Sequence, residues 1–336
     1  MRVLVTGASG FVGGWLAQSL VDEGHQVRVL VREPKDVEDL KPLKIEVAVG
    51  DITDVIQVTN AAKDIDTIFH LAGAIAYSSA ERENMERVNV GGTANVISAC
   101  KTNKVRRLVH FSSVVTVGSS FSPHNVLNEN SQYNLTSLNL GYFETKRKAE
   151  NLVFEAVRRG ELDAVCLNPS TIYGPGDEKK PSRGMQKRVA KGTLPFYTSG
   201  GVNVVSIEDV IYCTLKAWQI GKSGERYIIA GENLTIKKLF EKIAYIAGVK
   251  PPRFYVPDFL IKLLGRIGDF QARRGKKAFL TYENAVVATM FHWFDSSKAQ
   301  KAFQFKPKPA SYCLRQSIEW SRRNAPDTEA NEAEEL

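Results

Sequence analysis

Apolar and polar positions alternate along the first half of the chain with two different periods. Short apolar runs predict buried strands, and apolar residues spaced three and four apart predict amphipathic helices between them. The predicted strands are residues 3–5, 26–32, 45–49, 66–71, 105–111 and 163–167, and the predicted helices are one beginning near Trp15 and those at 81–101 and 142–159. This order is typical of an α/β fold built on a Rossmann-type, doubly wound parallel sheet.

The pattern changes after residue 177, where strands and helices no longer alternate regularly. The segments predicted there are strands at 203–207 and 226–230 and helices at 208–218, 235–247 and 259–272. We therefore predict a Rossmann domain over residues 1–173 and a smaller C-terminal, mainly substrate-binding region over 174–326, with strands near 203–230 returning to the Rossmann sheet. The polar and acidic stretch 327–336 predicts a disordered tail.

A glycine-rich turn separates the first strand from the first helix, with Gly7, Gly10 and Gly13 in sequence. The pyrophosphate of a dinucleotide must approach backbone N–H groups and the positive end of a helix dipole, and a Cβ would obstruct that approach. Three glycines in a turn can also serve only a positive φ and close helix packing. Their place directly between strand and helix favours an NAD(P)-binding turn.

The residue at the end of the second strand bears on the choice between NAD and NADP. An NAD enzyme usually presents Asp or Glu there to the 2′-hydroxyl of the adenosine ribose. This chain presents Arg32, preceded by Val31, and a guanidinium suits a 2′-phosphate. The position favours NADP(H) and leaves NAD(H) as an alternative. Alternatively, Arg32 is an ordinary solvated arginine at a strand end and has no role in cofactor binding.

Three further stretches lie where a Rossmann fold meets its cofactor. Gly50-Asp51-Ile52 follows the third strand and is a candidate contact for the adenine edge, although Asp51 could instead cap the next helix. Small residues in Leu71-Ala72-Gly73-Ala74 would let the cofactor lie across the strand tips. Proline and glycine in 168–176 predict a bent loop that passes beside the nicotinamide.

The residues that carry chemistry are a strand-end serine and a helical Tyr-Lys pair. The fifth strand delivers Ser112 and Ser113 at its carboxyl end, the edge where open α/β sheets bind ligands. Tyr142 and Lys146 are four residues apart on a predicted helix, and therefore share one face. We expect the ammonium to lower the phenol pKa by favouring the phenolate, which makes Tyr142 an acid–base catalyst. Taken alone, the pair would equally suit a helix surface.

With the glycine turn, Ser113, Tyr142 and Lys146 in this order, the chain resembles the extended short-chain dehydrogenase/reductases over nearly its whole length. It is similar to the dihydroflavonol reductase-like, hopanoid-associated sugar epimerase-like and 3β-hydroxysteroid dehydrogenase-like branch of that superfamily. The stretches behind this likeness are Val31-Arg-Glu-Pro34, Val105-Arg-Arg-Leu-Val-His-Phe-Ser-Ser113, Tyr142-Phe-Glu-Thr-Lys146 with Ala149-Glu150, Asn168-Pro-Ser-Thr171 and Gly224-Glu-Arg-Tyr227.

The resemblance implies a role for each of the three chemical residues. Tyr142 would be the proton donor or acceptor, Lys146 would bind the nicotinamide ribose and tune Tyr142, and Ser113 would orient the reacting carbonyl. The cofactor-binding set that the motifs and the resemblance imply is Gly7, Ser9, Gly10, Phe11, Val12, Gly13, Arg32, Asp51, Ile52, Leu71, Ala72, Gly73, Asn89, Tyr142, Lys146, Asn168, Pro169 and Ser170.

Departures from the family patterns narrow the function. Sugar-nucleotide 4,6-dehydratases carry Asp-Glu directly after the residue matching Ser113, where this chain has Val114 and Val115. The Asn-Asn-Leu that marks galactose epimerases after the loop matching Gly174 is also missing. We expect an NAD(P)H-dependent oxidoreductase that reduces a ketone or aldehyde to an alcohol, or catalyses the reverse reaction, with an NAD-dependent nucleotide-sugar epimerase as the alternative. A non-catalytic cofactor-binding scaffold comes third, because a scaffold needs no tuned phenolate.

Composition sets limits on partners and location. The chain has 336 residues with 43% hydrophobic, enough for a sizeable core, and a formal net charge of +8 that becomes +13 without the acidic tail. No basic-aromatic recognition module accompanies the charge, so we expect no nucleic acid. Four cysteines without a C-x-x-C pair predict reduced thiols and no metal site. No signal peptide is recognisable, and we expect a cytoplasmic enzyme, with a homodimer through two long helices as a further possibility.

The stretch 257–277 raises the question of a membrane surface. Apolar residues on one side of the predicted helix are Phe259, Leu260, Leu263, Leu264, Ile267 and Phe270, and the basic residues toward its flanks and end are Lys262, Arg266, Arg273 and Arg274. One interpretation is that the apolar side packs on the substrate-binding region, so that the helix forms a lid. The alternative is peripheral contact with anionic lipid that gives access to a hydrophobic carbonyl substrate.

Overall fold

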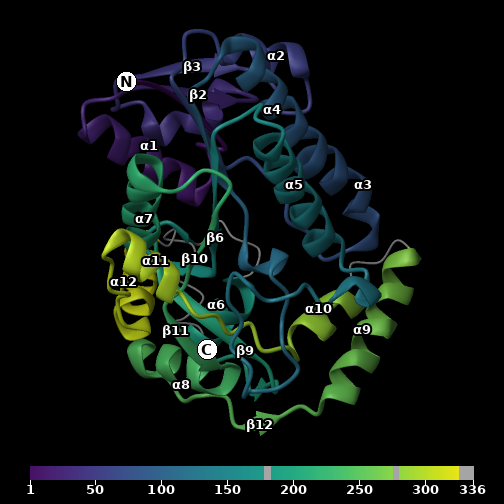
Figure 1. Ribbon diagram of the computed structural model, residues 1–336. Helices are drawn as coiled ribbons and strands as arrows, with labels where there is room; N and C mark the ends of the chain where they lie inside the picture. The colour runs from purple at the N-terminus through teal and green to yellow at the C-terminus, as the bar shows by residue number, and fades with distance from the viewer. Residues whose placement is uncertain (178–182, 275–279, 325–336) are drawn as a thin grey trace.

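The computed structural model describes residues 1–177, 183–274 and 280–324 (Figure 1). A seven-stranded parallel sheet with the order β10-β6-β5-β4-β1-β2-β3 forms its centre. Its strands are β1 (Arg2–Thr6), β2 (Gln26–Val31), β3 (Ile45–Val49), β4 (Thr67–His70), β5 (Arg107–Phe111), β6 (Ala164–Pro169) and β10 (Arg226–Ile229). The predicted Rossmann-type α/β fold is confirmed, since the strand order reverses between β1 and β4.

Helices cover both faces of this sheet. One face carries α1 (Phe11–Asp22), α7 (Ile207–Ile220) and α11 (Ser297–Phe303), and the other carries α2 (Val55–Ala61), α4 (Gly92–Asn103) and α5 (Gly141–Arg158). Because both faces are covered, the central strands are buried along their whole length, which explains their nearly continuous apolar sequence.

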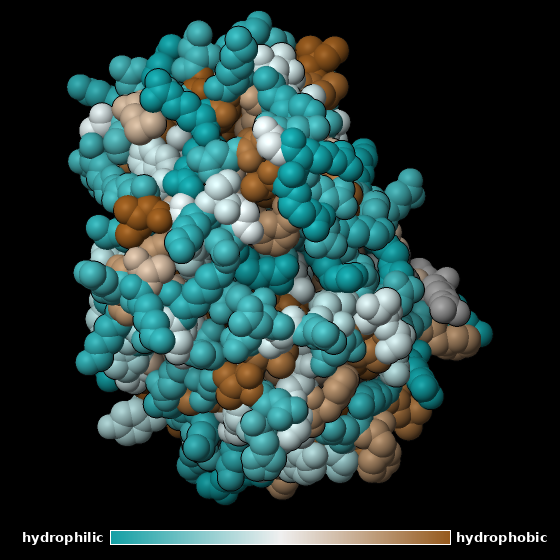
Figure 2. All heavy atoms as spheres, viewed as in Figure 1, coloured by the Kyte–Doolittle hydropathy of each residue, from teal (hydrophilic) through white to brown (hydrophobic). Residues whose placement is uncertain are grey.

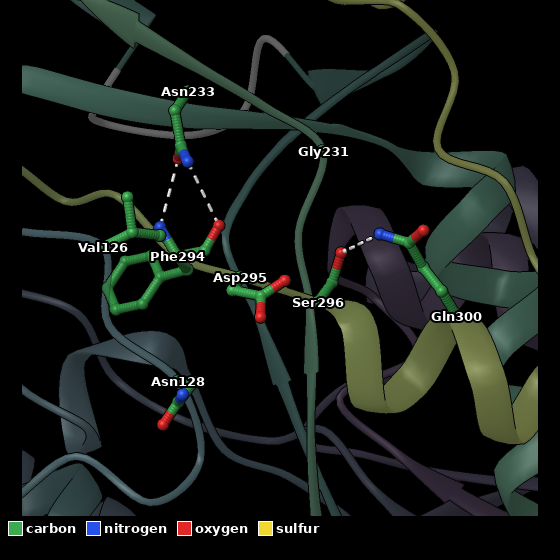
Figure 3. Close-up of a pocket in the computed structure, with 8 residues that line it drawn as sticks. All are labelled: Val126, Asn128, Gly231, Asn233, Phe294, Asp295, Ser296 and Gln300. Carbon is green, nitrogen blue, oxygen red and sulfur yellow. Dashed lines mark hydrogen bonds between the residues drawn. The ribbon is translucent and has the colours of Figure 1, made fainter.

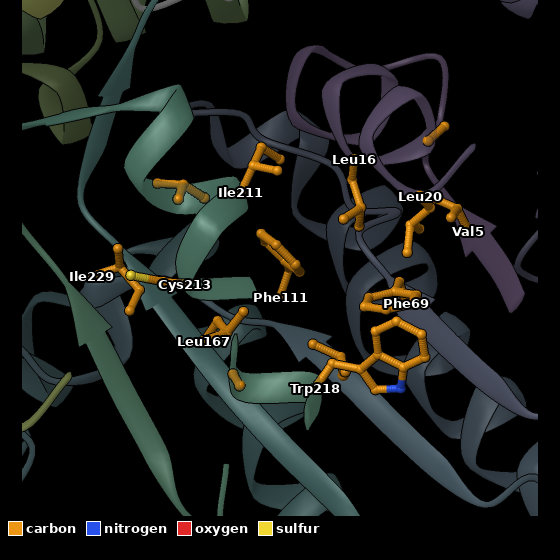
Figure 4. Close-up of a cluster of buried hydrophobic side chains, with 14 of the residues drawn as sticks. Val5, Leu16, Leu20, Phe69, Phe111, Leu167, Ile211, Cys213, Trp218 and Ile229 are labelled. Atoms are coloured by element: carbon orange, nitrogen blue, oxygen red, sulfur yellow. The ribbon is translucent and has the colours of Figure 1, made fainter. Parts of the chain in front are cut away.

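The core on the α1 face joins segments far apart in sequence. Leu16 and Leu20 from α1, Phe69 from β4 and Phe111 from β5 pack with Trp218 from α7 (Figure 4). The Trp218 ring meets Phe69 edge to face with 5.2 Å between centroids, and its Nε1 donates to Thr67 Oγ1 at 3.0 Å. This contact fixes α7, which belongs to the second half of the chain, against the first half.

The C-terminal region forms a smaller layer below the sheet. It contains a three-stranded sheet of β7 (Thr171–Tyr173), β9 (Gly201–Ser206) and β11 (Glu232–Thr235), and a strand pair of β8 (Phe196–Tyr197) and β12 (Phe254–Tyr255). Its helices are α6 (Gly184–Ala190), α8 (Ile236–Ala247), α9 (Asp258–Arg273), α10 (Tyr282–Val287) and α12 (Ala310–Arg323). Of the strands near 203–230, only β10 returns to the Rossmann sheet, because β9 pairs with β7 and β11 instead.

The helix predicted over 81–101 is interrupted in the structure. A short α3 (Arg82–Met85) passes into a π-helical turn at Glu86–Gly91 before α4 begins. The extra residue in a π turn rotates the side chains that follow, and such turns often occur at functional sites. Here the turn carries Asn89, which is buried. The uniform helix expected from the apolar spacing was wrong at this point.

No helix among the described residues is long and apolar enough to cross a bilayer. The predicted disordered tail, 327–336, lies outside the described residues, as does the side chain of Arg273.

Candidate active site

The turn between β1 and α1 depends on its glycines. Gly7 has φ of +76°, and a Cβ there would lie 2.7 Å from the backbone nitrogen of Ala72. A Cβ on Gly13 would lie 2.1 Å from the carbonyl oxygen of Gly7, so only glycine lets α1 approach the turn this closely. Gly10 caps the helix without a side-chain hydrogen bond, and the first turn of α1 has no acidic residue. This cradle fits a pyrophosphate at a helix N-terminus.

The end expected for the adenosine brings together residues from three segments. Arg32 is exposed directly after β2. The pKa of Asp51 is lowered, chiefly by the hydrogen bond from the Thr53 backbone and further by the Thr53 side chain and the charges of Arg32 and Arg87. The Asp51 carboxylate accepts from Thr53 N and Oγ1 at 2.8 and 2.7 Å. The cap of α2 is Asp54, whose Oδ1 accepts from the first-turn amides, so the interpretation of Asp51 as a helix cap was wrong.

Ser113 and Tyr142 meet at the carboxyl end of β5. Ser113 follows the strand and caps a short 3₁₀ turn, and its side chain acts on the Tyr142 phenol, whose pKa it lowers slightly. Burial raises the pKa of Tyr142 to about 12, and the Ser113 contact offsets only part of that effect. The sequence-based expectation of a lowered phenol pKa is therefore corrected: loss of solvation dominates and raises the pKa, so the phenol keeps its proton at neutral pH.

Lys146 lies one turn beyond Tyr142 and is also buried. Its Nζ donates to the carbonyl oxygen of Phe111 at 2.6 Å, which ties α5 to the end of β5. Burial lowers the pKa of Lys146 to about 8, while the charges of Glu150 and Cys166 act in the opposite direction. The ammonium form therefore prevails at pH 7 and gives way to the neutral amine as the pH rises through about 8.

A buried polar network underlies Ser113. The Asn168 amide nitrogen donates to Glu150 Oε1 at 2.7 Å, to Thr116 Oγ1 at 2.9 Å and to the carbonyl oxygen of Ser113 at 3.0 Å. Asn168 and Glu150 are both fully buried, and Glu150 also pairs with Arg226 of β10 at 3.4 Å. Asn168 stays a predicted cofactor contact, and its amide nitrogen also fixes the backbone that presents Ser113.

Asn89 has a comparable role on the other side of the site. Its Oδ1 accepts from Ala74 N at 2.7 Å, and its Nδ2 donates to the Ala74 carbonyl at 2.9 Å and to Thr145 Oγ1 at 3.1 Å. It thus joins the loop after β4 to helix α5. We predicted Asn89 as a cofactor contact, and the structure shows its side-chain amide used within the protein.

The remaining predicted positions occupy the expected edge of the sheet with different exposures. Ser9, Gly10 and Gly73 are exposed, Phe11, Val12, Ile52, Leu71, Ala72 and Ser170 are partly buried, and Ser112 is buried. Pro169 belongs to β6 and pairs with Ile229. The loop that follows β7 reaches the glycine turn, because Trp15 Nε1 donates to the Pro175 carbonyl at 3.0 Å.

Apolar and aromatic side chains surround Tyr142. The cluster contains Met85, Val115, Leu135, Leu140, Tyr142, Phe143, Val286 and Met290, with Ala74, Ala76, Tyr77, Tyr133, Leu138, Tyr282 and Val287 packed against it. The Tyr77 ring lies 6.1 Å from the Tyr142 ring in an edge-on arrangement. Helix α10, from the C-terminal region, closes this side of the site. The neighbourhood suits an apolar reactant more than a charged one.

Sequence reasoning missed the part that Glu150 and Thr116 play. Glu150 follows Lys146 by four residues, so the helical spacing that paired Tyr142 with Lys146 also placed Glu150 on that face. Thr116 gave no comparable signal, since its position depends on the 3₁₀ turn after Ser113.

A surface cavity of about 480 Å³ lies apart from these residues, between the 126–128 loop and the start of α11 (Figure 3). Asn233 bonds to the backbone of Phe294 there, and Gln300 donates to Ser296 Oγ at 3.0 Å. Its lining includes none of the predicted catalytic residues. No cluster of possible metal ligands occurs in the described part of the chain.

Comparison with known proteins agrees with this geometry. A model of the 3-beta hydroxysteroid dehydrogenase/isomerase family matches residues 4–254, from β1 through the glycine turn and the Tyr-Lys helix to β12. The chain belongs to this family. Its resemblance to the extended short-chain dehydrogenase/reductases is thereby confirmed, and the family indicates an NAD(P)-dependent oxidoreductase.

Known relatives match this member of the family over nearly the whole chain. It is 29% identical over 322 residues to the putative dihydroflavonol 4-reductase of Synechocystis sp., covering 94% of this chain and 93% of that protein. It is 28% identical to sterol demethylase protein B of Methylococcus capsulatus, covering 96% and 98%. The crystal structure of gox2253 is similar with a TM-score of 0.85 and 33% identity, covering 96% of this chain and 98% of that one.

Proposed function

We propose that this protein is an NADPH-dependent reductase that converts a ketone or aldehyde into an alcohol. The observation that carries the proposal is the Tyr142 phenol, buried beside Ser113 at the edge of the sheet that also carries the glycine turn. A phenol with a pKa of about 12 keeps its proton at neutral pH and can donate it to a substrate. Reduction of a carbonyl needs a proton donor of this kind, whereas oxidation of an alcohol needs the phenolate.

In the proposed reaction the reduced nicotinamide supplies a hydride to the carbonyl carbon. Tyr142 gives its proton to the carbonyl oxygen, and the Ser113 hydroxyl donates a hydrogen bond to the same oxygen. Lys146 is charged below its pKa of about 8 and stabilises the phenolate that proton transfer leaves on Tyr142. Asn168 and Glu150 hold the Ser113 backbone in place throughout.

The wall around Tyr142 supports an apolar carbonyl substrate. Tyr77, Val115 and Val286 offer a ring and branched apolar side chains to a reactant. The names of relatives point in the same direction, since they include a putative dihydroflavonol 4-reductase, a sterol demethylase protein and 2-alkyl-3-oxoalkanoate reductases. Solved sugar epimerases near 20% identity share the fold alone.

The preference for NADPH rests on Arg32. Its guanidinium stands exposed at the end of β2, and Arg87 adds a second positive charge near Asp51. Both guanidinium groups act on Asp51, so cationic side chains stand at the position expected for a 2′-phosphate.

The test combines identification of the cofactor with turnover. The purified protein is denatured and any released dinucleotide identified, and NADPH oxidation is then followed with a panel of apolar ketones and aldehydes and with UDP-glucose. We expect exchangeable NADPH and one alcohol formed for each NADPH consumed. Tightly retained NAD, with a sugar epimerised and no net cofactor oxidation, would replace the proposal with the epimerase alternative.

A further inference from the structure

Helix α9 exposes its large apolar residues. Phe259, Leu260, Leu263, Leu264, Ile267 and Phe270 form a stripe, defined here as the α9 stripe, whose members are between 39% and 69% exposed. At about 100° per residue they cover about 140° of the helix circumference. Figure 2 shows apolar side chains gathered at the lower right edge of the molecule, where Figure 1 places α9. Contiguous exposed apolar surface of this kind marks an interaction site.

The face that α9 buries is made of small residues instead. Gly265 packs so closely on α10 that a Cβ there would lie 2.8 Å from the Cα of Tyr282. Ile261 and Gly268 are buried on the same side. The helix is therefore held to the protein through its glycines, which turns the leucines and phenylalanines outward. The interpretation of the stripe as a surface packed on the substrate region is contradicted for the described residues.

The acidic and basic side chains of α9 also differ in what they contact. Asp258 accepts a hydrogen bond from Ser199 Oγ at 2.6 Å, and Asp269 accepts from Tyr282 N at 3.3 Å, so both partly exposed carboxylates are tied to neighbouring segments. Arg266 and Arg274 are exposed beside the stripe, and Lys262 is partly exposed. The outward surface thus pairs an apolar stripe with a cationic flank.

We propose that α9 is an interfacial helix that docks this protein on an anionic phospholipid surface. An apolar face with adjacent basic residues is the composition that lies in the plane of a membrane interface. Phe254 and Tyr255, which are exposed just before the helix, supply aromatic side chains of the kind that favour the headgroup level. The charge complementarity selects anionic over neutral lipid.

A second copy of this chain fits the stripe less well. Symmetric pairing would place the same patch on both subunits and bring two cationic flanks to one seam. The helix is about 24 Å long, and a stable interface needs about 800 Å² from each partner, more than one helix of this length offers. Lipid supplies both the opposite charge and an unlimited apolar surface.

Docking through α9 also has a geometric consequence for the active site. Helix α10 lies directly behind α9, and its Tyr282 and Val286 belong to the apolar neighbourhood of Tyr142. The surface placed on the membrane is therefore one helix away from the candidate active site. This inference goes beyond the proposed reduction, because docking does not depend on what reaction Tyr142 performs.

The experiment is sedimentation of the full chain with vesicles of phosphatidylcholine alone or with a third of phosphatidylglycerol, at low and high salt. We expect binding to the anionic vesicles that falls with salt. Leu263→Asp should weaken it at least about tenfold, and the double variant Lys262→Ala/Arg266→Ala about 30-fold at low salt. The matched controls are Ile56→Asp on α2 and Arg158→Ala on α5, both highly exposed, which should bind as the wild type does.

Each result decides the proposal independently of catalysis. Absence of binding, equal binding to neutral vesicles, or equal losses in the controls would overturn it. Size-exclusion chromatography of the wild type and Leu263→Asp tests whether a second copy of the chain covers the stripe instead. A wild-type dimer that Leu263→Asp converts to a monomer, with no vesicle binding, would assign the stripe to a second copy. Thermal unfolding checks that Leu263→Asp is folded. NADPH oxidation with a water-soluble carbonyl, which should be unchanged in these variants, tests the proposed function separately.

Discussion

Asn168 and Glu150 are joined by a 2.7 Å hydrogen bond that links the strand ending beside the active site to the helix carrying Tyr142. Both side chains are fully buried. Through the Ser113 carbonyl, the same Asn168 amide nitrogen reaches the residue that would orient the substrate. The position of Ser113 relative to Tyr142 therefore depends on a contact that neither residue makes itself.

Replacement of Glu150 by Gln should change the pH profile of turnover. The negative charge of Glu150 raises the pKa of Lys146, so its loss should lower that pKa further below about 8 and move the alkaline limb of the profile to lower pH. Measurement of kcat against pH checks this, with Glu155→Gln, partly exposed on the same helix, as the control. An unchanged limb in Glu150→Gln would show that Glu150 has only a structural role.

Removal of the Tyr142 hydroxyl should abolish turnover and spare cofactor binding. The ring of Tyr142→Phe still fills the apolar site, while loss of a general acid costs about 10²–10⁴-fold in rate. Turnover and NADPH titration check the two parts, and Lys146→Ala should impair both. Tyr133→Phe, which loses a hydrogen bond to Glu144 instead, is the control. We would abandon the assignment if Tyr142→Phe kept more than a tenth of wild-type turnover with a rate-limiting chemical step.

The cofactor preference should disappear when Arg32 is replaced by Ala. A charge-assisted hydrogen bond to a phosphate contributes about 1.5–3 kcal/mol, or about one to two decades in affinity. Titrations of NADPH and NADH into wild type and Arg32→Ala measure it, and Arg106→Ala, exposed at the opposite end of the sheet strands, should retain the preference. Equal dissociation constants for the two cofactors in the wild type would contradict the assignment.

Acid should destabilise the protein through three buried histidines. Burial lowers the pKa of His70 to about 3, that of His292 to about 4 and that of His110 well below its usual value. The unfolded chain takes up protons near pH 6.5 and the folded chain does not, so their stabilisation is present above pH 6.5 and is lost as the pH falls toward the folded values. Each contributes a slope of up to about 1.4 kcal/mol per pH unit.

Urea unfolding between pH 7 and 5 measures this slope. His110→Phe removes one proton-binding site while keeping the ring that packs 5.3 Å from His70, so stability should fall less steeply with acid. His124→Gln at an exposed position should leave the slope unchanged. Identical slopes in the wild type and His110→Phe would refute the account of acid sensitivity.

The sequence predicted the fold and the chemical residues where local spacing carries the information. The strand and glycine pattern around Gly7 and Gly13 predicted the Rossmann-type sheet. The four-residue spacing predicted that Tyr142 and Lys146 lie on one face of the same helix. Helix α9 was predicted within a residue at each end, at 259–272 against Asp258–Arg273.

Properties that depend on tertiary packing could not be predicted in the same way. The pKa of Tyr142 is raised by burial, to which segments as distant as α10 contribute, and the spacing to Lys146 gave no sign of it. Asn89 and Asn168 were recognised by position, but their partners come from other elements. The outward direction of the α9 stripe follows from the close packing of Gly265 on α10, and a helical periodicity cannot say which face a neighbour covers.

The most direct test of the proposed function is transfer of deuterium to an apolar ketone or aldehyde from NADPH in which both hydrogens at C4 of the nicotinamide are replaced by deuterium. Mass spectrometry of the product compares wild type with Tyr142→Phe. We predict an alcohol that carries the label on the former carbonyl carbon, formed in equal amount to NADP⁺ by the wild type and almost absent with Tyr142→Phe. Unlabelled alcohol, or labelled alcohol formed equally well by Tyr142→Phe, would contradict reduction by hydride transfer with Tyr142 as the proton donor.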